Sequence, residues 1–312
     1  MNIAVIGAGA MGGVWAARLA AAGEEVTVVD VSTEVVGAIN ADGLVVEGKD
    51  GGTETARVYA TGDPAEVGPV DAAFFFVKAH HTAGAAALAR PLVGPATTVV
   101  SLQNGWGNAD TLAGVFPPER LALGVTYHSA KVLAPGRVAH TAVGPTFLGP
   151  YADGAAGDGA EAIGAAMAAA GIETTVSAGV KTEVWKKLIL NCATLPTSSL
   201  TRLQTGNLGQ PGPLLDLLDA VAAEATAVAN AKGYEIDIKE RLETIHGLLG
   251  RGGAGKASML QDVEAGHKTE IEVINGAIVR AAVETGIDAP LNRAMVALIG
   301  GLERSWAQGG PV

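Results

Sequence analysis

Two polar residues interrupt an apolar stretch in the second half of the chain. Lys187 and Asn191 lie in the segment EVWKKLILNC and are four residues apart. If this segment is a helix, the two side chains share one face and the apolar residues surround them. A lysine in such a place can donate a proton, and an asparagine there needs hydrogen-bond partners or a ligand. The alternative is that the lysines extend their ammonium groups into water, which explains Lys186 better than Lys187.

The first thirty residues predict a dinucleotide site. An apolar strand leads into the turn GAGAMG and an alanine-rich helix, and a second apolar strand ends in Asp30. Gly7 permits the tight turn, Gly9 lets a pyrophosphate approach the backbone, and Gly12 lets helix and strand pack closely. The alternative is a glycine-rich turn in another kind of parallel α/β protein. The expected cofactor contacts in this region are Gly7, Ala8, Gly9, Ala10, Met11, Gly12 and Asp30.

Asp30 also bears on the choice of cofactor. It follows Gly12 by 18 residues, where a carboxylate would accept hydrogen bonds from the ribose hydroxyls and repel a 2′-phosphate. The residues themselves therefore favour NAD over NADP.

Polar residues follow two further apolar runs. Lys78 follows residues 70–77, and Asn104 comes shortly after residues 97–102. Ligands of open α/β sheets bind at the carboxyl ends of the strands, so both side chains are expected near the cofactor. The alternatives are a solvated loop lysine and a turn-forming asparagine before Gly105.

The order of these elements predicts an α/β protein with an N-terminal Rossmann-type doubly wound parallel sheet and an all-helical C-terminal domain. We expect a dinucleotide-binding domain over residues 1–178 and a helical substrate and catalytic domain over residues 179–312. The helices expected in the second domain are 181–192, 214–232, 239–249, 269–284 and one that starts at Pro290.

Composition limits the partners. The 312 residues carry a net charge of −11, which argues against binding of nucleic acid. No apolar run is long enough for a membrane helix and no signal sequence is evident, so we expect a cytoplasmic protein without a membrane partner. The single cysteine, Cys192, excludes an intramolecular disulfide and is expected to be a core thiol. The apolar helical half is compatible with a homodimer.

Two further motifs are interpreted as decoys. The sequence of residues 250–256, GRGGAGK, fits the phosphate loop of nucleotide hydrolases, but Ala257 replaces the hydroxyl residue that holds magnesium, and a helix is expected before the loop. A flexible glycine loop is the better interpretation. The pair His80-His81 has no third ligand nearby in sequence, so no metal site is expected.

With these motifs, the chain resembles the ketopantoate reductase (2-dehydropantoate 2-reductase) family over nearly its full length. The matching features are GAGAMG, Lys78, Asn104-Gly105, WKKLILNC and the segment SMLQD…TEIEVING over residues 258–276. The resemblance implies reduction of the ketone of a branched 2-oxo acid, ketopantoate, to D-pantoate during pantothenate biosynthesis. The hydride would come from a reduced nicotinamide cofactor, NAD(H) or NADP(H).

The resemblance also implies roles for individual residues. It assigns catalysis to Lys187 and Glu270, substrate binding to Asn191 and Ser258, and a place between cofactor and substrate to Lys78 and Asn104. The chemistry agrees, because an ammonium can stabilise and protonate the oxygen that becomes negative on hydride transfer. Burial would lower the pKa of Lys187 and Glu270 would oppose that fall. The alternatives are a helix cap for Ser258 and a solvated first-turn acid for Glu270.

The sequence departs from the family pattern at three positions. Leu195 and Gly255 stand where many relatives have asparagines, and Asp30 stands where many NADP-using members have a basic or neutral residue. These departures keep open a second hypothesis, an NAD-dependent D-2-hydroxyacid dehydrogenase of the same family that acts on other branched or aromatic 2-oxo acids. A dinucleotide sensor without turnover is a remote third hypothesis.

Overall fold

The computed structural model describes residues 1–155 and 157–307, which form two compact units. The first unit comprises residues 1–103 and 108–183, and the second comprises residues 104–107 and the chain from Val184 onward. The predicted class, a parallel α/β sheet followed by helices, is confirmed. The domain boundary after residue 178 stays a prediction, and residues 156 and 308–312 of the two expected domains lie outside the described residues.

The first unit is built on a sheet whose strands run in the order β12-β11-β8-β7-β6-β1-β2-β5. Neighbours from β5 to β8 are parallel, and β11 pairs antiparallel with β8. The chain therefore changes direction of winding at β1, which is the switch point where open α/β sheets bind ligands. The strands are β1 (Asn2–Ile6), β2 (Glu25–Val29), β5 (Tyr59–Thr61), β6 (Ala72–Phe75), β7 (Thr98–Ser101), β8 (Leu121–Thr126), β11 (Thr146–Pro150) and β12 (Thr174–Val176).

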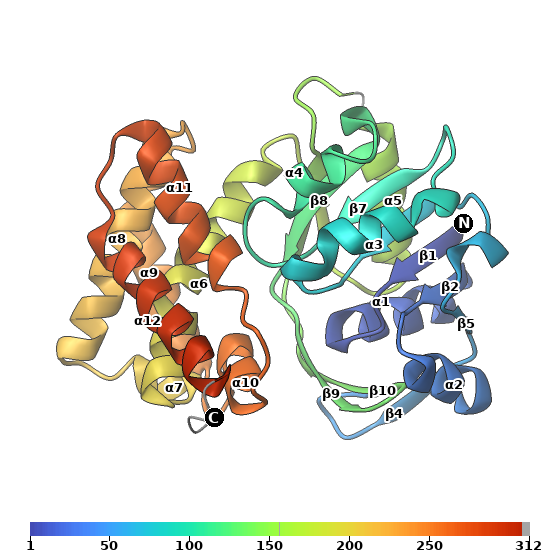
Figure 1. The fold of residues 1–312 in the computed structure, drawn as a ribbon, viewed down its shortest axis with the longest axis horizontal. Coiled ribbons are helices and arrows are strands. Elements are labelled where there is room, and N and C mark those ends of the chain that lie inside the picture. The colour runs from blue at the N-terminus through green and yellow to red at the C-terminus, as the bar shows by residue number, and fades with distance from the viewer. Residues whose placement is uncertain (156, 308–312) are drawn as a thin grey trace. The chain divides into compact units, whose positions relative to one another are not determined.

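Both faces of this sheet are covered, which is why its strands are apolar throughout. In β6, Phe74 belongs to the core on one face and Phe75 to the core on the other. Figure 1 shows helices packed along the sheet of this unit. They are α1 (Ala10–Ala21), α2 (Thr33–Asp42), α3 (Thr82–Leu88), α4 (Asn108–Ala113) and α5 (Asp158–Ala169).

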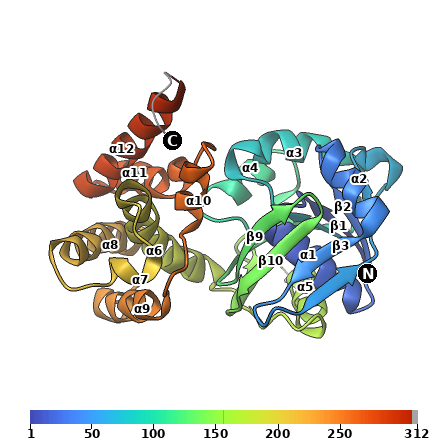
Figure 2. The same cartoon turned by 90° about the horizontal axis from the view of Figure 1, so that it is seen from below.

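A second, four-stranded sheet in the order β4-β3-β10-β9 belongs to the same unit. It packs against α1, so this helix has a sheet on each side, as Figure 2 shows for β9 and β10. Its strands are β3 (Leu44–Glu47), β4 (Thr53–Ala56), β9 (Ser129–Ala134) and β10 (Arg137–Ala142).

The second unit is helical. Its core contains the apolar residues that flank Lys187, including Trp185 and Leu188, together with residues of the later helices. These helices are α6 (Val180–Thr201), α7 (Thr205–Leu208), α8 (Pro213–Ala231), α9 (Ile238–Arg251), α10 (Ser258–Glu264), α11 (Asn275–Thr285) and α12 (Pro290–Ala307). Among the described residues, no helix has both the length and the apolar character needed to cross a membrane.

Two expected helices differ from the observed ones. The helix expected over residues 181–192 continues through Pro196 to Thr201. The helix expected over residues 269–284 was wrong at its start, because a short 3-10 helix (Ile271–Val273, η5) comes first and α11 begins only at Asn275. The Val273 carbonyl accepts the Trp106 N–H at 2.8 Å, a contact from a distant segment that periodicity does not predict.

Candidate active site

The glycine turn after β1 has the geometry that its sequence predicts. Gly7 has a φ of +95°, which favours glycine, and its N–H donates to the Val29 carbonyl at 2.9 Å. A Cβ on Gly12 would lie 1.9 Å from the Gly7 carbonyl oxygen, so this position needs glycine. A Cβ on Gly9 would meet nothing within 4 Å. The turn therefore leaves open space beside the start of α1, as a bound pyrophosphate requires.

Asp30 lies at the end of β2, where two backbone amides fix its carboxylate. Ala8 N–H donates to Oδ2 at 2.8 Å and Ser32 N–H donates to Oδ1 at 2.9 Å. The first of these bonds ties Asp30 directly to the glycine turn. Each carboxylate oxygen accepts more than one hydrogen bond, so Asp30 can still bind ribose hydroxyls from this fixed position.

The carboxyl ends of β6 and β7 are joined by Gln103. Its Nε2 donates to the Val77 carbonyl at 2.7 Å and to Thr82 Oγ1 at 2.8 Å. Lys78 follows Val77, is half-buried, and precedes a 3-10 helix at residues 79–81. The expected position of Lys78 at the carboxyl end of a parallel strand is thus observed.

Lys187 and Asn104 meet in the second unit. Lys187 Nζ donates to Asn104 Oδ1 at 2.8 Å. Burial removes water from the ammonium and lowers the pKa of Lys187 to about 8, while the negative charge of Glu270 acts in the opposite direction. Glu270 is only 8% exposed and lies before η5, not inside a helix, so the alternative of a solvated first-turn acid was wrong.

The segment that carries Asn104 is fastened to the helical unit. Besides the bond from Trp106 N–H to Val273, Gly105 has a φ of +87°, and a Cβ there would lie 2.4 Å from the Val273 carbonyl oxygen. The Trp106 ring packs on Trp185 and Tyr234 at centroid distances of 5.5 and 6.1 Å. Trp106 was not among the residues predicted from the sequence. Its position directly after Asn104-Gly105 was the feature that could have indicated it.

Two further expected site residues belong to this unit. Asn191 is 6% exposed, lies one helical turn after Lys187, and its amide forms no hydrogen bond within the described chain. Ser258 is the first residue of α10, not its cap, and Ala257 occupies the cap position, so the capping interpretation was wrong. The hydroxyl of Ser258 also has no hydrogen bond among the described residues, which leaves both groups able to bind a ligand.

The glycine loop over residues 250–256 has a structural role. Helix α9 precedes the glycine loop, as expected, and the carbonyl of Gly255 accepts hydrogen bonds from Thr205 N–H and Oγ1 at 2.8 and 2.9 Å. In the part of the chain that the structure describes, no three His, Cys, Asp or Glu side chains are grouped as a metal site requires.

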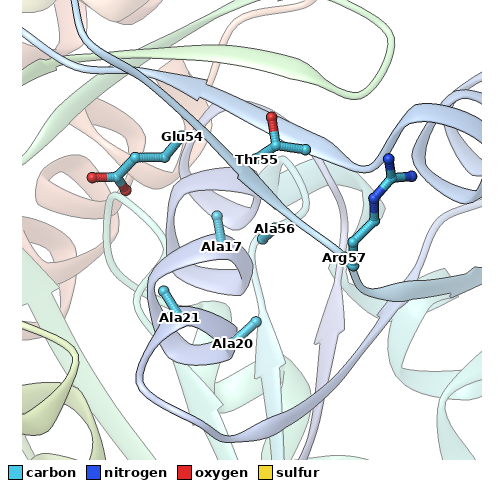
Figure 3. A pocket seen from close by; sticks show the side chains of 7 residues that line it. All are labelled: Ala17, Ala20, Ala21, Glu54, Thr55, Ala56 and Arg57. Carbon is cyan, nitrogen blue, oxygen red and sulfur yellow. The ribbon is translucent and has the colours of Figure 1, made fainter.

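The first unit also contains a hollow that is lined by other residues. Figure 3 shows Ala17, Ala20 and Ala21 of α1 beneath strand β4, with Glu54 and Arg57 at opposite ends. Arg57 already donates to the Ala41 carbonyl at 3.2 Å. None of the expected site residues lines this hollow, and its small apolar floor offers no chemistry.

Two family models match the chain. The model described as ketopantoate reductase PanE/ApbA matches residues 3–153, and its C-terminal counterpart matches residues 180–303. The chain is similar to the 2-dehydropantoate 2-reductase of Halobacterium salinarum, with 32% identity over 96% of this chain and 98% of the relative. It is also similar to the enzyme of that name from Pyrococcus abyssi, with 34% identity over 97% and 98% of the two chains.

Solved structures are similar to the chain over nearly its full length. A PanE/ApbA family ketopantoate reductase from Ralstonia eutropha JMP134 is 33% identical and matches with a TM-score of 0.88 over 98% of this chain and 99% of that one. The ternary structure of a D-mandelate dehydrogenase with NADH and anilino(oxo)acetate is 25% identical, with a TM-score of 0.92 over the same shares of the two chains.

Proposed function

Because the chain belongs to the ketopantoate reductase PanE/ApbA family of oxidoreductases, we propose that it reduces ketopantoate to D-pantoate with a reduced nicotinamide cofactor. The observation that best supports this proposal is the hydrogen bond from Lys187 to Asn104, formed by a lysine with a pKa of about 8. Such a lysine is protonated at neutral pH yet gives up its proton readily, as a general acid must.

In the proposed mechanism Lys187 is the general acid. When bound, a reduced nicotinamide would supply the hydride for the carbonyl carbon. The ammonium of Lys187 would stabilise the negative charge on the substrate oxygen and donate a proton to it. The Asn104 amide oxygen orients the ammonium, and Glu270 favours its protonated form. Asn191 and Ser258 would bind the hydroxyl and carboxylate of the substrate with groups that no described residue engages.

Residues of the first unit fit the cofactor. The glycine turn from Gly7 to Gly12 would hold the pyrophosphate, and Asp30 would bind the ribose, which favours NADH over NADPH. We place Lys78 near the nicotinamide end. This assigns cofactor binding to residues 1–178 and substrate binding and catalysis to residues 179–312.

The partners in this proposal are small molecules. A cytoplasmic location is part of this proposal. A homodimer, and the lack of nucleic-acid and membrane partners, stay predictions.

A second candidate is an NAD-dependent D-2-hydroxyacid dehydrogenase for other branched or aromatic 2-oxo acids. Leu195 favours it, because this side chain lies one turn after Asn191, is 8% exposed and packs in the apolar core. It offers a substrate no polar contact. The similarity to D-mandelate dehydrogenase is in keeping with this candidate. The non-catalytic sensor has no comparable support.

Steady-state oxidation of NADH and of NADPH with a panel of 2-oxo acids tests the proposal. The panel contains ketopantoate and branched and aromatic analogues without its hydroxyl group. The proposal expects the highest kcat/KM with ketopantoate. A preference for an aromatic or unsubstituted branched acid would support the second candidate, and no turnover with any of them would contradict both.

A further inference from the structure

A carboxylate near the end of the chain binds the segment that carries Glu270. Glu303 of α12 accepts two hydrogen bonds with Oε1, from Thr269 N–H at 2.8 Å and from Thr269 Oγ1 at 2.6 Å. Thr269 Oγ1 in turn accepts the Ile271 N–H at 3.3 Å. Thr269 and Ile271 are each 2% exposed, so the residues on both sides of Glu270 are fixed in the interior.

No regular helix sets the position of Glu270. Its φ and ψ are −98° and 23°, and its carbonyl accepts the N–H groups of Val273 and Ile274 at 3.1 and 3.2 Å in a tight turn. A turn of this kind has few hydrogen bonds of its own. The two bonds that Glu303 accepts from Thr269 attach the beginning of this turn to α12.

We propose that Glu303 is a positioning residue for the reaction, which holds Thr269 and Ile271 so that the Glu270 carboxylate stays near the Lys187 ammonium. This inference rests on the proposed function of Lys187 as general acid. Glu303 acts through Glu270 and is not itself a catalytic residue.

Displacement of Glu270 would change the protonation of Lys187, an effect that loss of stability alone would not produce. If Glu270 moves away from Lys187, its favourable interaction with the ammonium weakens, and Lys187 loses its proton at lower pH. The fall of kcat/KM at basic pH should then begin at lower pH. A variant that merely unfolds more easily lowers the amount of active enzyme but keeps the midpoint of the pH profile.

The test compares Glu303→Ala, Glu303→Gln, Glu270→Gln and the double variant Glu303→Ala/Glu270→Gln. We expect Glu303→Ala to lower the midpoint of the basic limb by at least half the shift that Glu270→Gln causes. Glu303→Gln keeps an oxygen that can accept both bonds from Thr269, so its midpoint should stay near that of the wild type. The double variant should match Glu270→Gln alone, since the two residues act in series.

Thr226→Val is the matched stability control. Thr226 is 2% exposed and donates to the Ala222 carbonyl at 2.8 Å within α8, so its loss should lower the melting temperature without moving the midpoint. The inference is overturned if Glu303→Ala leaves the midpoint unchanged, or if the double variant shows the sum of the single shifts. It is also overturned if Glu303→Gln shifts as far as Glu303→Ala, because the charge of Glu303 and not its hydrogen bonds would then act.

A second measurement separates this inference from the proposed function. The pH dependence of Lys187 labelling by an amine-reactive acylating reagent, followed by peptide mass spectrometry, reports the protonation of Lys187 without any substrate. We expect the same order of midpoints among the variants. If no 2-oxo acid is reduced, the proposed function fails while this titration still decides the role of Glu303, and equal midpoints in Glu303→Ala and wild type would refute that role.

Discussion

At the scale of single residues, the protonation of Lys187 depends on two opposing influences. Burial favours the neutral amine, and the charge of Glu270 favours the ammonium; the result is a pKa of about 8 instead of the usual 10.5. The ammonium donates a hydrogen bond to Asn104 Oδ1 at 2.8 Å, which fixes its direction. The proposed role of Lys187 as a proton donor near neutral pH rests on this lowered pKa.

This arrangement predicts the pH dependence of reduction. The proposed role of Lys187 requires its acid form, so kcat/KM should be level below pH 8 and fall as the pH rises through about 8. Glu270→Gln removes the influence that raises the pKa, so the fall should begin at lower pH. A pH profile of kcat/KM measures both effects, and a basic limb unchanged by Glu270→Gln would contradict the role given to Glu270.

Asp30 permits a second prediction at this scale. Replacing Asp30 with serine removes the charge that would repel a 2′-phosphate, so the ratio of kcat/KM with NADPH to that with NADH should rise about tenfold, or about 1.4 kcal/mol. Initial rates with the two cofactors measure this ratio. Glu34→Gln, an exposed acid in the first turn of α2, is the control for a general effect of charge. An unchanged ratio in Asp30→Ser would remove the argument for NAD.

The sequence predicted some of these residues better than others. Helical spacing was enough to place Asn191 with Lys187. It could not predict the contact between Lys187 and Asn104, because 83 residues separate them and only tertiary structure brings them together. Glu303 was missed for the same reason, since an acid in the last turns of a helix ordinarily lies in water.

At the scale of elements, helix α6 contains Pro196 in its interior, where a proline ordinarily interrupts a helix. Pro196 has no N–H to donate to the Cys192 carbonyl, which follows Asn191 directly. Asn275 Nδ2 replaces that donor at 2.9 Å and also donates to Asn292 Oδ1 at 3.0 Å. Both asparagines are fully buried. Their network lets α6 continue past the proline, so the face that carries Lys187 and Asn191 stays helical.

A double-mutant cycle tests this compensation. Asn275→Ala should lower the free energy of unfolding by about 1–3 kcal/mol, because it leaves a buried carbonyl without a donor. In a Pro196→Ala background the new N–H of residue 196 can donate to the Cys192 carbonyl. Asn275→Ala should then lower the free energy of unfolding by at least about 0.5 kcal/mol less than it does in the wild type. Chemical denaturation measures both values.

Pro290→Ala is the matched control for this cycle. It removes a proline at the start of α12, where no carbonyl four residues earlier depends on it. The cost of Asn275→Ala should be the same in that background as in the wild type. Equal costs in the Pro196→Ala background as well would show that Asn275 does not compensate for the proline.

The glycine turn and the residues around Glu270 differ in how well the sequence predicts them. Gly7 and Gly12 are needed for local backbone reasons, so the pattern alone identified their turn. The segment from Thr269 to Ile274 has helical spacing in sequence, but contacts to α12 and to the segment at residues 104–107 determine its conformation. Local periodicity contains no information about such contacts.

At the scale of the whole molecule, the described chain forms two units with separate cores. Composition and element order predicted this division into an α/β part and a helical part. They did not predict that Asn104–Gly107 belongs to the helical unit. The reason is that the membership of this segment depends on Gly105 and Trp106 packing against Val273 and on the aromatic contacts of Trp106.

The first unit contains a buried histidine pair that should make it sensitive to acid. His128 Nδ1 and His140 Nε2 are 2.8 Å apart, with stacked rings, and Trp15 of α1 packs on His128. Burial, and then the charge of Arg18, lower the pKa of His140, while a hydrogen bond with the Ala142 backbone and then the charge of Glu54 act in the opposite direction. Such a histidine binds its proton more tightly in the unfolded chain than in the folded one.

The sign of the effect on stability follows from the lowered pKa. The contribution of His140 is present above the unfolded pKa of about 6.5 and is lost as the pH falls toward the lower folded value, by up to about 1.4 kcal/mol per pH unit. The free energy of unfolding of the first unit, measured by denaturation, should therefore decline as the pH falls from 7.5 to 5. The decline should be shallower in His140→Asn than in the wild type. An equal slope in the variant would show that other groups cause the acid sensitivity.

The proposed function depends on proton donation by Lys187 during reduction of a 2-oxo acid. Comparing Lys187→Ala with Lys186→Ala tests it most directly, by the rate of a single turnover with the preferred 2-oxo acid and by the affinity for the cofactor. We expect Lys187→Ala to lose about 100-fold or more in rate with cofactor affinity nearly unchanged, and Lys186→Ala to stay near the wild type. Turnover that survives in Lys187→Ala would contradict the assignment of Lys187 as general acid.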